Sequence, residues 1–309
     1  MKNYLKCLAL LACAMLLAAC GAGRVRLGTA DIGGKYYAFG EAFAKCVTEK
    51  TGKPLEARKT AGSAANLRLL SDGYLELGIA QSDLIADALS GSGLYAGKPR
   101  TGYSAISGLY TEACQILVRE DSPIYEIDDL FGRPVSIGEA ESGTESTAWR
   151  ILTAYGIARD KVSAVNLDYA KAAAALESGT IDAAFCTAGG AIEAFESLSE
   201  RVPLRLLSLE GRAASLLLRN NPSFTRVEVP AGLYKGQEKT ESLGVRAILL
   251  ASDRLDAATV KALTEVLYTH EKSLGLELSR DLDLRFHPGA EAYFEDAGLL
   301  PADREGTAK

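Results

Sequence analysis

Short apolar runs and segments of helical apolar spacing alternate along residues 25–89. The clearest helical segment covers residues 36–48, where Phe39, Phe43 and Val47 recur on one face. Small residues separate each run from the next, as at turns between a strand and a helix. This alternation predicts parallel βαβ units. The predicted strands are 25–29, 55–59 and 77–80, and the predicted helices are 36–48, 64–70 with Ser63 as its N-cap, and 82–89.

The same alternation resumes over residues 134–209, which indicates a second α/β block. Two long apolar runs, 110–120 and 243–251, flank this block and are typical of strands that cross between two lobes. A helix predicted over 257–274 would return the chain to the first lobe. In the second block the predicted strands are 134–138, 164–167, 181–186 and 204–209, and the predicted helices are 145–155, 171–177 and 191–198. We therefore predict an α/β protein in which residues 24–115 and 245–305 form lobe I and residues 116–244 form lobe II.

The N-terminal segment is typical of an export signal. Lys2 and Lys6 precede an almost wholly apolar run, residues 8–19, that is too short to span a bilayer as a helix. Leu-Ala-Ala-Cys at residues 17–20 resembles a bacterial lipoprotein processing site. We predict that residues 1–19 are a lipoprotein signal peptide and that Cys20 is lipidated, which gives an extracytoplasmic protein (periplasm or cell surface) anchored by lipid alone. An ordinary cleaved signal with an incidental cysteine is the alternative.

The net charge argues against a nucleic-acid-binding site, and the cysteine and histidine content argues against a metal site. The formal net charge is −6, and removal of the signal takes away two lysines more, so nucleic acid is not an expected partner. Cys46, Cys114 and Cys186 are widely spaced in apolar stretches, and His270 and His287 are the only histidines. We expect no metal site and three buried, unpaired cysteines, although one disulfide with one free thiol remains an alternative.

Four segments place glycine and hydroxyl or amide residues between a predicted strand and a predicted helix: 33–37, 62–66, 81–83 and 142–145. A helix start presents unpaired N–H groups and the positive end of the helix dipole, which together bind anions. Ligands in open α/β sheets also bind at the carboxyl ends of strands. Helix capping alone would use the same residue types, so capping is the alternative for any single segment. Four such segments in two α/β blocks favour a ligand cleft.

Catalytic patterns have little support in this chain. Neither a GxSxG nor an HExxH motif occurs, and residues 91–96 approximate a dinucleotide fingerprint without a following helix. We therefore expect a binding protein without a cofactor, most simply a monomer, and not an enzyme.

Beyond these patterns, the sequence resembles the TAXI family of TRAP-transporter solute receptors. The resemblance implies a type II periplasmic-binding-protein fold, and an integral-membrane TRAP permease as partner. It also implies a small carboxylate as ligand, similar to glutamate, glutamine or 2-oxoglutarate. The stretches that carry it are LGTADIGGKYYAFGEAFAKCV, TAGSAANLRLLSDGYLELGIAQSDL, AISGLYTEACQILVREDSPIYEIDDLFGRPVSIGEAESGTESTAWRILTAYGI, SGTIDAAFCTAGG, VEVPAGLYKGQ and RFHPGAEAYFEDAG.

The resemblance also implies a set of pocket residues. We hypothesise that helix-start N–H groups and the hydroxyls of Ser142 and Thr144 hold a ligand carboxylate, with tyrosine packing from the other lobe. Asp31 and Lys35 depart from the family pattern, and Lys35 would add a positive charge at the rim. The implied ligand-binding residues are Tyr36, Tyr37, Ser63, Asn66, Gln81, Ser82, Asp83, Ser142, Gly143, Thr144, Thr187, Ala188 and Gly189.

Two other functions use related folds. A ligand-sensing or immunogenic surface lipoprotein would present the same cleft to a signalling partner and not to a permease. An enzyme that makes pyrimidine cofactor precursors would need reactive Cys or His groups in the cleft, and only Cys186 lies near a predicted loop. The first is the stronger alternative.

Overall fold

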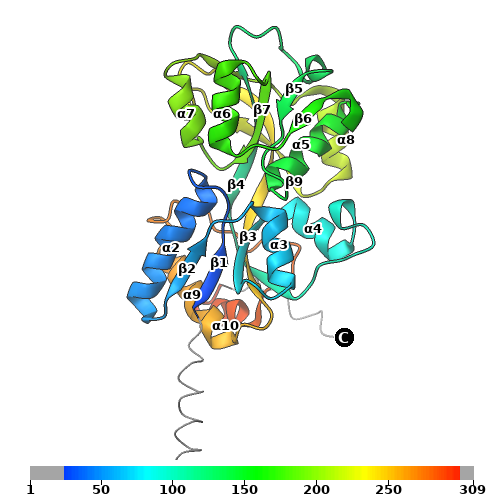
Figure 1. Cartoon of the computed structure of the whole chain (residues 1–309). Helices are drawn as coiled ribbons and strands as arrows, with labels where there is room; N and C mark the ends of the chain where they lie inside the picture. The colour runs from blue at the N-terminus through cyan, green and yellow to red at the C-terminus, as the bar shows by residue number, and fades with distance from the viewer. Residues whose placement is uncertain (1–23, 300–309) are drawn as a thin grey trace, which may run out of the picture.

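A computed structural model describes residues 24–299. The predicted signal peptide, the lipidation site at Cys20 and residues 300–305 of predicted lobe I lie outside the described residues. Within residues 24–299, ten strands form one sheet in the order β2-β1-β3-β10-β4-β7-β5-β6, in which β8 also pairs with β4 and β9 with β10. Figure 1 shows two lobes, one above the other, with long strands running through the waist between them.

The lower lobe in Figure 1 begins with parallel βαβ units, as the sequence predicts. Each strand is followed, directly or after a short loop, by a helix whose start lies near the strand's carboxyl end. Ser63 is the first residue of α3 and not its N-cap, which is Gly62, so this prediction was wrong by one position. The elements are β1 (Val25–Gly28), α2 (Lys35–Thr51), β2 (Leu55–Arg58), α3 (Ser63–Ser71), β3 (Leu77–Gln81), α4 (Ser82–Ser90) and the short η1 (Gly93–Tyr95).

The upper lobe repeats this arrangement and adds elements that the sequence analysis did not predict: α8, β9 and the short 3-10 helices η2 and η3. Strand β9 lies at the edge of the sheet, and only its two end residues, Phe224 and Val229, are buried. The elements are η2 (Ile127–Leu130), β5 (Pro134–Ser136), α5 (Gly143–Ala154), η3 (Arg159–Lys161), β6 (Ser163–Val165), α6 (Tyr169–Ser178), β7 (Ala183–Ala188), α7 (Glu193–Ser199), β8 (Leu204–Leu206), α8 (Gly211–Asn220) and β9 (Phe224–Val229).

The two predicted crossing strands are present and are longer than predicted. They are β4 (Tyr103–Arg119) and β10 (Thr240–Ser252), which pair antiparallel along the waist. Strand β10 also pairs with β3 below and with β9 above, while β4 pairs with β7 above. Both strands are buried along most of their length. They therefore form the covalent connection between the two lobes.

Helices α9 (Ala257–Thr269) and α10 (Pro288–Asp296) pack together at the bottom of the lower lobe in Figure 1. Asp256 caps α9 by accepting a hydrogen bond from Thr259 N, and His287 caps α10 in the same way. Helix α9 ends five residues before the predicted position, in a turn that contains Gly275 at φ 64°. No helix within residues 24–299 combines the length and apolar character needed to cross a membrane.

The buried side chains form separate cores. One cluster draws on residues 25–110 and 247–294, and two clusters draw on residues 114–245. Two cores are expected for a chain of this length. We keep the predicted lobe boundaries as a proposal and use lobe I and lobe II for the parts of the chain that they define.

Candidate functional site

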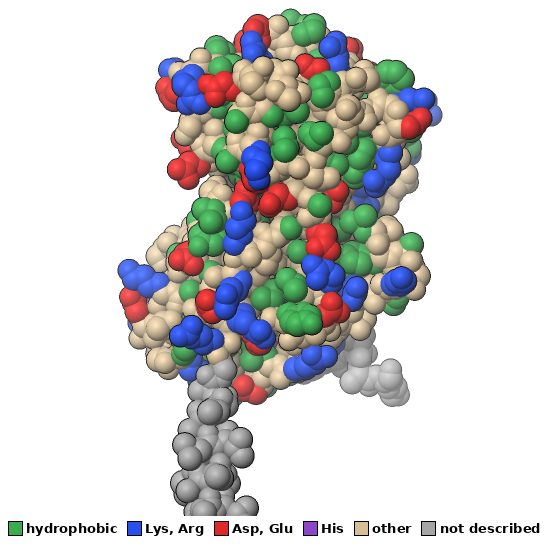
Figure 2. Space-filling model, in the orientation of Figure 1, with side chains coloured by type: hydrophobic (Ala, Val, Ile, Leu, Met, Phe, Trp, Pro, Cys, Tyr) green, Lys and Arg blue, Asp and Glu red, His purple; other side chains and the backbone are tan. Residues whose placement is uncertain are grey.

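A cavity of about 50 Å³ lies between the two lobes. Its walls are the carboxyl ends of β1, β3 and β7, a central segment of β4, and the starts of α2, α3, α5 and α6, where ligands bind in open α/β sheets. Figure 2 shows acidic and basic side chains at this waist. The lining residues are Ala30, Asp31, Gly34, Lys35, Tyr36, Ala61, Gly62, Ser63, Gln81, Glu112, Gly138, Glu139, Ser142, Gly143, Thr144, Leu167, Asp168, Tyr169, Thr187, Ala188 and Ile192.

The structure brings most of the predicted site residues to this cavity. Those that line it are Tyr36, Ser63, Gln81, Ser142, Gly143, Thr144, Thr187 and Ala188. Those that lie elsewhere are Tyr37, Asn66, Ser82, Asp83 and Gly189.

Two hydroxyl residues at the start of α5, Ser142 and Thr144, accept hydrogen bonds from backbone N–H groups. Ser142 Oγ accepts a hydrogen bond from Glu145 N (3.0 Å), and Thr144 Oγ1 accepts one from Thr187 N (3.1 Å). Ser142 is therefore a helix cap as well as a pocket residue. Ser142 uses only an oxygen lone pair in this bond and still has its own hydrogen to donate, whereas the Thr144 hydroxyl also lies within hydrogen-bonding reach of Tyr169.

The starts of α3 and α5 meet across the cleft. Gly62, the N-cap of α3, has φ 118°, and a side chain there would lie 3.6 Å from Ser142 Cα. A side chain at Gly143 would come within 2.4 Å of the Gln81 amide. Ala65 N also donates to Glu141 O (3.1 Å) from the facing lobe. Two helix starts, both with positive dipole ends, thus point at one small volume.

Asn66 and Ser63 organise lobe I beneath the cavity. The Asn66 amide donates to Thr29 O (2.7 Å) and Ile79 O (2.8 Å), and its Oδ1 accepts from the Thr60 hydroxyl (2.8 Å). Ser63 Oγ accepts from Gln81 N (3.2 Å). These bonds join α3 to the ends of β1 and β3, so Asn66 positions the loops that line the cavity.

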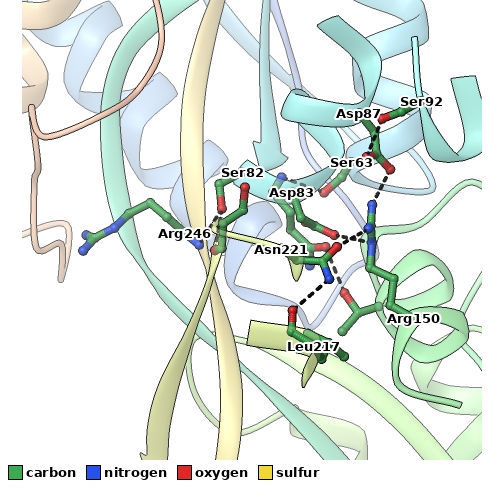
Figure 3. A network of polar contacts seen from close by, with 12 residues as sticks. Ser63, Ser82, Asp83, Asp87, Ser92, Arg150, Leu217, Asn221 and Arg246 are labelled. Atoms are coloured by element: carbon green, nitrogen blue, oxygen red, sulfur yellow. Dashed lines mark hydrogen bonds and ion pairs between the residues drawn. The ribbon is translucent and has the colours of Figure 1, made fainter. Parts of the chain in front are cut away.

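Ser82 and Asp83 join the lobes beside the crossing strands, away from the cavity. Ser82 Oγ donates to Ser223 O (3.3 Å) and accepts from Arg246 N (3.2 Å). Figure 3 shows Arg150 of α5 reaching Asp83 of α4, with 3.2 Å between Nε and Oδ2. Burial raises the pKa of Asp83 to about 6, against the opposing charge of Arg150.

Arg150 has two further partners in Figure 3. Its Nη2 contacts the Asp87 carboxylate, and its Nη1 donates to Asn221 Oδ1 (2.9 Å). One guanidinium from lobe II therefore holds two carboxylates of lobe I.

Tyr37 is half-buried on α2, next to the pocket residue Tyr36. Gly189 lies against the ring of Tyr110, and its carbonyl accepts a hydrogen bond from Lys35 Nζ (3.3 Å). Lys35 Nζ also lies 3.9 Å from the centroid of the Tyr110 ring, a cation–π contact. Burial lowers the pKa of Lys35.

The main functional candidate that the sequence analysis missed is Glu112. It lies in β4, is 3% exposed, and accepts a hydrogen bond from the Tyr36 hydroxyl (2.7 Å). Burial raises the pKa of Glu112 to about 8. The signal was available, because Glu112 is the one charged residue in the run 106–118.

Three more carboxylates line the cavity. Asp31 forms an ion pair with Lys59 (2.7 Å), and Asp168 contacts Lys171. Glu139 is half-buried, and burial raises its pKa. The cavity therefore combines helix starts, which favour anions, with an excess of acidic side chains.

Two buried hydroxyls in this region, Thr187 Oγ1 and Tyr110 OH, have no hydrogen-bond partner in the described part of the chain. Such groups are rare because an unmade buried hydrogen bond is costly. Thr187 lines the cavity, so a ligand can supply its missing partner.

Neither metal nor disulfide chemistry is evident in residues 24–299. No group of three or more His, Cys, Asp or Glu side chains in that range is arranged to hold a metal ion. Cys114 and Cys186 are buried and unpaired, as expected, whereas Cys46 is unpaired but only half-buried.

The model of a family described as NMT1-like matches residues 27–298, so the chain belongs to the NMT1-like family. Three solved structures are similar to it. A binding-protein component of an ABC phosphonate transporter from Pseudomonas aeruginosa is 12% identical (TM-score 0.51), over 81% of this chain and 77% of that one. A Xanthomonas citri protein bound to chloride is 13% identical (TM-score 0.50), over 89% and 96%. The alkanesulfonate-binding protein of Xanthomonas axonopodis pv. citri, bound to MOPS, is 18% identical (TM-score 0.49), over 90% and 81%.

The first two likenesses concern the fold. They confirm the predicted two-lobed α/β fold of periplasmic solute-binding proteins.

Proposed function

We propose that this member of the NMT1-like family is an extracytoplasmic solute-binding receptor for a small carboxylate similar to glutamate, glutamine or 2-oxoglutarate. The observation that carries the proposal is the cavity between the lobes, at which the starts of α3 and α5 meet. A carboxylate there would face N–H groups that have no intrahelical partner, together with the hydroxyls of Ser142 and Thr144. We further propose that lipidated Cys20 anchors the receptor to the membrane.

The partner in this proposal is an integral-membrane permease of the TRAP type. The support is the resemblance of long stretches of the chain to the TAXI receptors. The alternative is an ABC permease, because the Pseudomonas aeruginosa neighbour is a component of an ABC transporter. Co-purification of the receptor with each class of permease from its own cell would separate the two.

Thermal unfolding of the domain after Cys20, with amino acids, dicarboxylates and oxoacids, tests the binding function. A ligand at ~100 times its Kd stabilises the native state by about 2.7 kcal/mol, which raises the Tm measurably. We expect a Tm increase with at least one small carboxylate, and its loss in Ser142→Ala and Thr144→Ala. Thr225→Ala, exposed on β9, is the matched control and should keep the increase. Cooperative unfolding without any ligand-dependent Tm change would contradict the proposal.

A further inference from the structure

Glu112 has no ion-pair partner within residues 24–299, unlike Asp31 and Asp168, and it is more deeply buried than Glu139, the other unpaired acid of the cavity. Asp31 is paired with Lys59 and Asp168 with Lys171, whereas no ion pair in residues 24–299 involves Glu112. Its hydrogen-bonding neighbours are the Tyr36 hydroxyl (2.7 Å) and the Gln81 amide, both neutral. A carboxyl group that is 3% exposed is expected to be paired or to be held neutral.

The nearest cation is already held by other groups. Lys35 lies on the Tyr110 ring and donates to Gly189 O. Lys35 forms no ion pair with Glu112 and acts on it only at longer range, where it lowers the pKa of Glu112 against the larger effect of burial. A cation that pairs with Glu112 has to come from outside the described chain.

Thr187 provides a second, independent observation. It pairs with Cys114 across the β4–β7 ladder, and Cys114 is two residues from Glu112. Residues two apart in a strand, and residues directly opposite in a ladder, share one face of the sheet. Thr187 and Glu112 therefore line the cavity from the same face. Within residues 24–299 the buried Thr187 hydroxyl has no hydrogen-bonding neighbour other than the weakly hydrogen-bonding thiol of Cys114 opposite it in the ladder.

We propose that Glu112 is a specificity-determining residue, which selects ligands that carry an ammonium group beside the carboxylate held at the start of α5. Thr187 Oγ1 accepts a second N–H bond from that ammonium group. The selection rests on the proposed function, because it concerns the same cavity and the same carboxylate. A dicarboxylate or oxoacid of equal length would leave Glu112 and Thr187 without their partner.

Protonation gives this selection a measurable signature. Because burial raises the pKa of Glu112 to about 8, its carboxyl is mostly protonated at pH 7 in the free receptor. The charged or titratable groups that interact with Glu112 are Tyr36, Lys35, Asp83, Tyr110 and Tyr169. A bound ammonium group favours the carboxylate form. Binding of an amine ligand at pH 7 should therefore release a proton, and its affinity should increase from pH 6 to pH 8.

Titration calorimetry with matched ligand pairs tests the proposal. L-Glutamate is compared with glutarate and 2-oxoglutarate, and L-glutamine with glutaramate, in two buffers of different ionisation enthalpy. We expect the amine of each pair to bind roughly 10- to 100-fold more tightly, since charged hydrogen bonds are worth that much. Glu112→Gln should remove most of this preference while leaving glutarate affinity within a few-fold.

Thr187→Val is the second variant, because it removes an unpartnered hydroxyl and keeps the shape. It should reduce the preference several-fold even if Glu112→Gln does not fold. Equal affinity for amine and non-amine ligands, or an equal loss for both in Glu112→Gln, would overturn the selection and leave the receptor function standing. If none of these carboxylates binds to the wild type, the proposed function fails, and the selection fails with it.

Discussion

Two buried carboxyl groups of lobe I, Glu112 and Asp83, have different partners in the folded protein. Both are 3% exposed and both lie at the boundary with lobe II. Asp83 faces the guanidinium of Arg150, and its pKa is raised only to about 6 (Figure 3). Glu112 faces the Tyr36 hydroxyl, and its pKa is raised to about 8.

The difference indicates two roles. An acid that is paired across the lobe boundary contributes to holding the lobes together. An acid that is buried without a cation is costly to the folded protein, and such a cost is typical of binding and catalytic sites. The comparison therefore assigns Asp83 to structure and Glu112 to the ligand.

The largest expected effect is on stability at high pH in Glu112→Gln. The pKa of an unperturbed Glu is about 4.3, and that of Glu112 in the folded state is about 8. Between these values the folded state binds more protons than the unfolded state, so this group makes the wild type less stable as the pH rises. Removing the carboxyl should make the variant more stable than the wild type by on the order of a few kcal/mol at pH 8.

Urea denaturation at pH 5 and pH 8 measures this difference. The advantage of the Gln variant should shrink toward pH 5, because the pH then approaches the unfolded-state pKa of about 4.3 and keeping the carboxyl neutral in the folded state costs little. Parallel stability profiles for the two proteins would show that Glu112 is not held in its neutral form.

The next effect is expected in Arg150→Met, which leaves Asp83 buried without its cation. Breaking one side of a buried ion pair costs about 3–5 kcal/mol, and the value here should lie at the lower end because Arg150 is partly exposed. The loss should be larger at pH 8 than at pH 5, because a protonated Asp83 needs no cation. Chemical denaturation at both values checks this, with Arg219→Met, exposed on α8, as the matched control. A loss of equal size at both pH values would show that Arg150 acts by packing and not through Asp83.

Much of the fold could be predicted because its determinants are local. The alternation of short apolar runs with helical spacing gives the βαβ units, and two long, mainly apolar runs give β4 and β10. Strand β9 could not be found in this way, because Arg226 and Glu228 interrupt its pattern and its pairing with β10 is non-local.

The site residues that could be predicted from the sequence are mainly those at the starts of helices. Ser142, Gly143 and Thr144 lie where the motif predicts. Asn66 and Asp83 carry the same local signal, yet their partners are backbone carbonyls and an arginine far along the chain. Glu112 carries no helix-start signal at all, and only the three-dimensional structure shows that it is buried beside Tyr36.

The smallest expected effect concerns a third acid at the lobe boundary, Glu141, which contrasts with both buried ones. Its carboxylate forms two hydrogen bonds with Arg68 (2.9 and 2.8 Å), but the side chains are 50% and 37% exposed, so the pair contributes less than about 1 kcal/mol. Glu141 also has φ 64°, a conformation that costs a side chain about 1 kcal/mol and glycine nothing.

Glu141→Gly and Glu141→Ala separate the ion pair from the backbone conformation. Both lose the contact with Arg68, but only the Gly variant also loses the strain, so it should be more stable than the Ala variant by about 1 kcal/mol. Thermal unfolding should place its Tm about 2–4 °C above that of Glu141→Ala and close to that of the wild type. If the Tm of both variants falls by the same amount below that of the wild type, the ion pair contributes more to stability at this position than the backbone conformation does. An exposed acid would then hold the lobes together as Asp83 does, and burial would not be the property that separates linking acids from the ligand-binding Glu112.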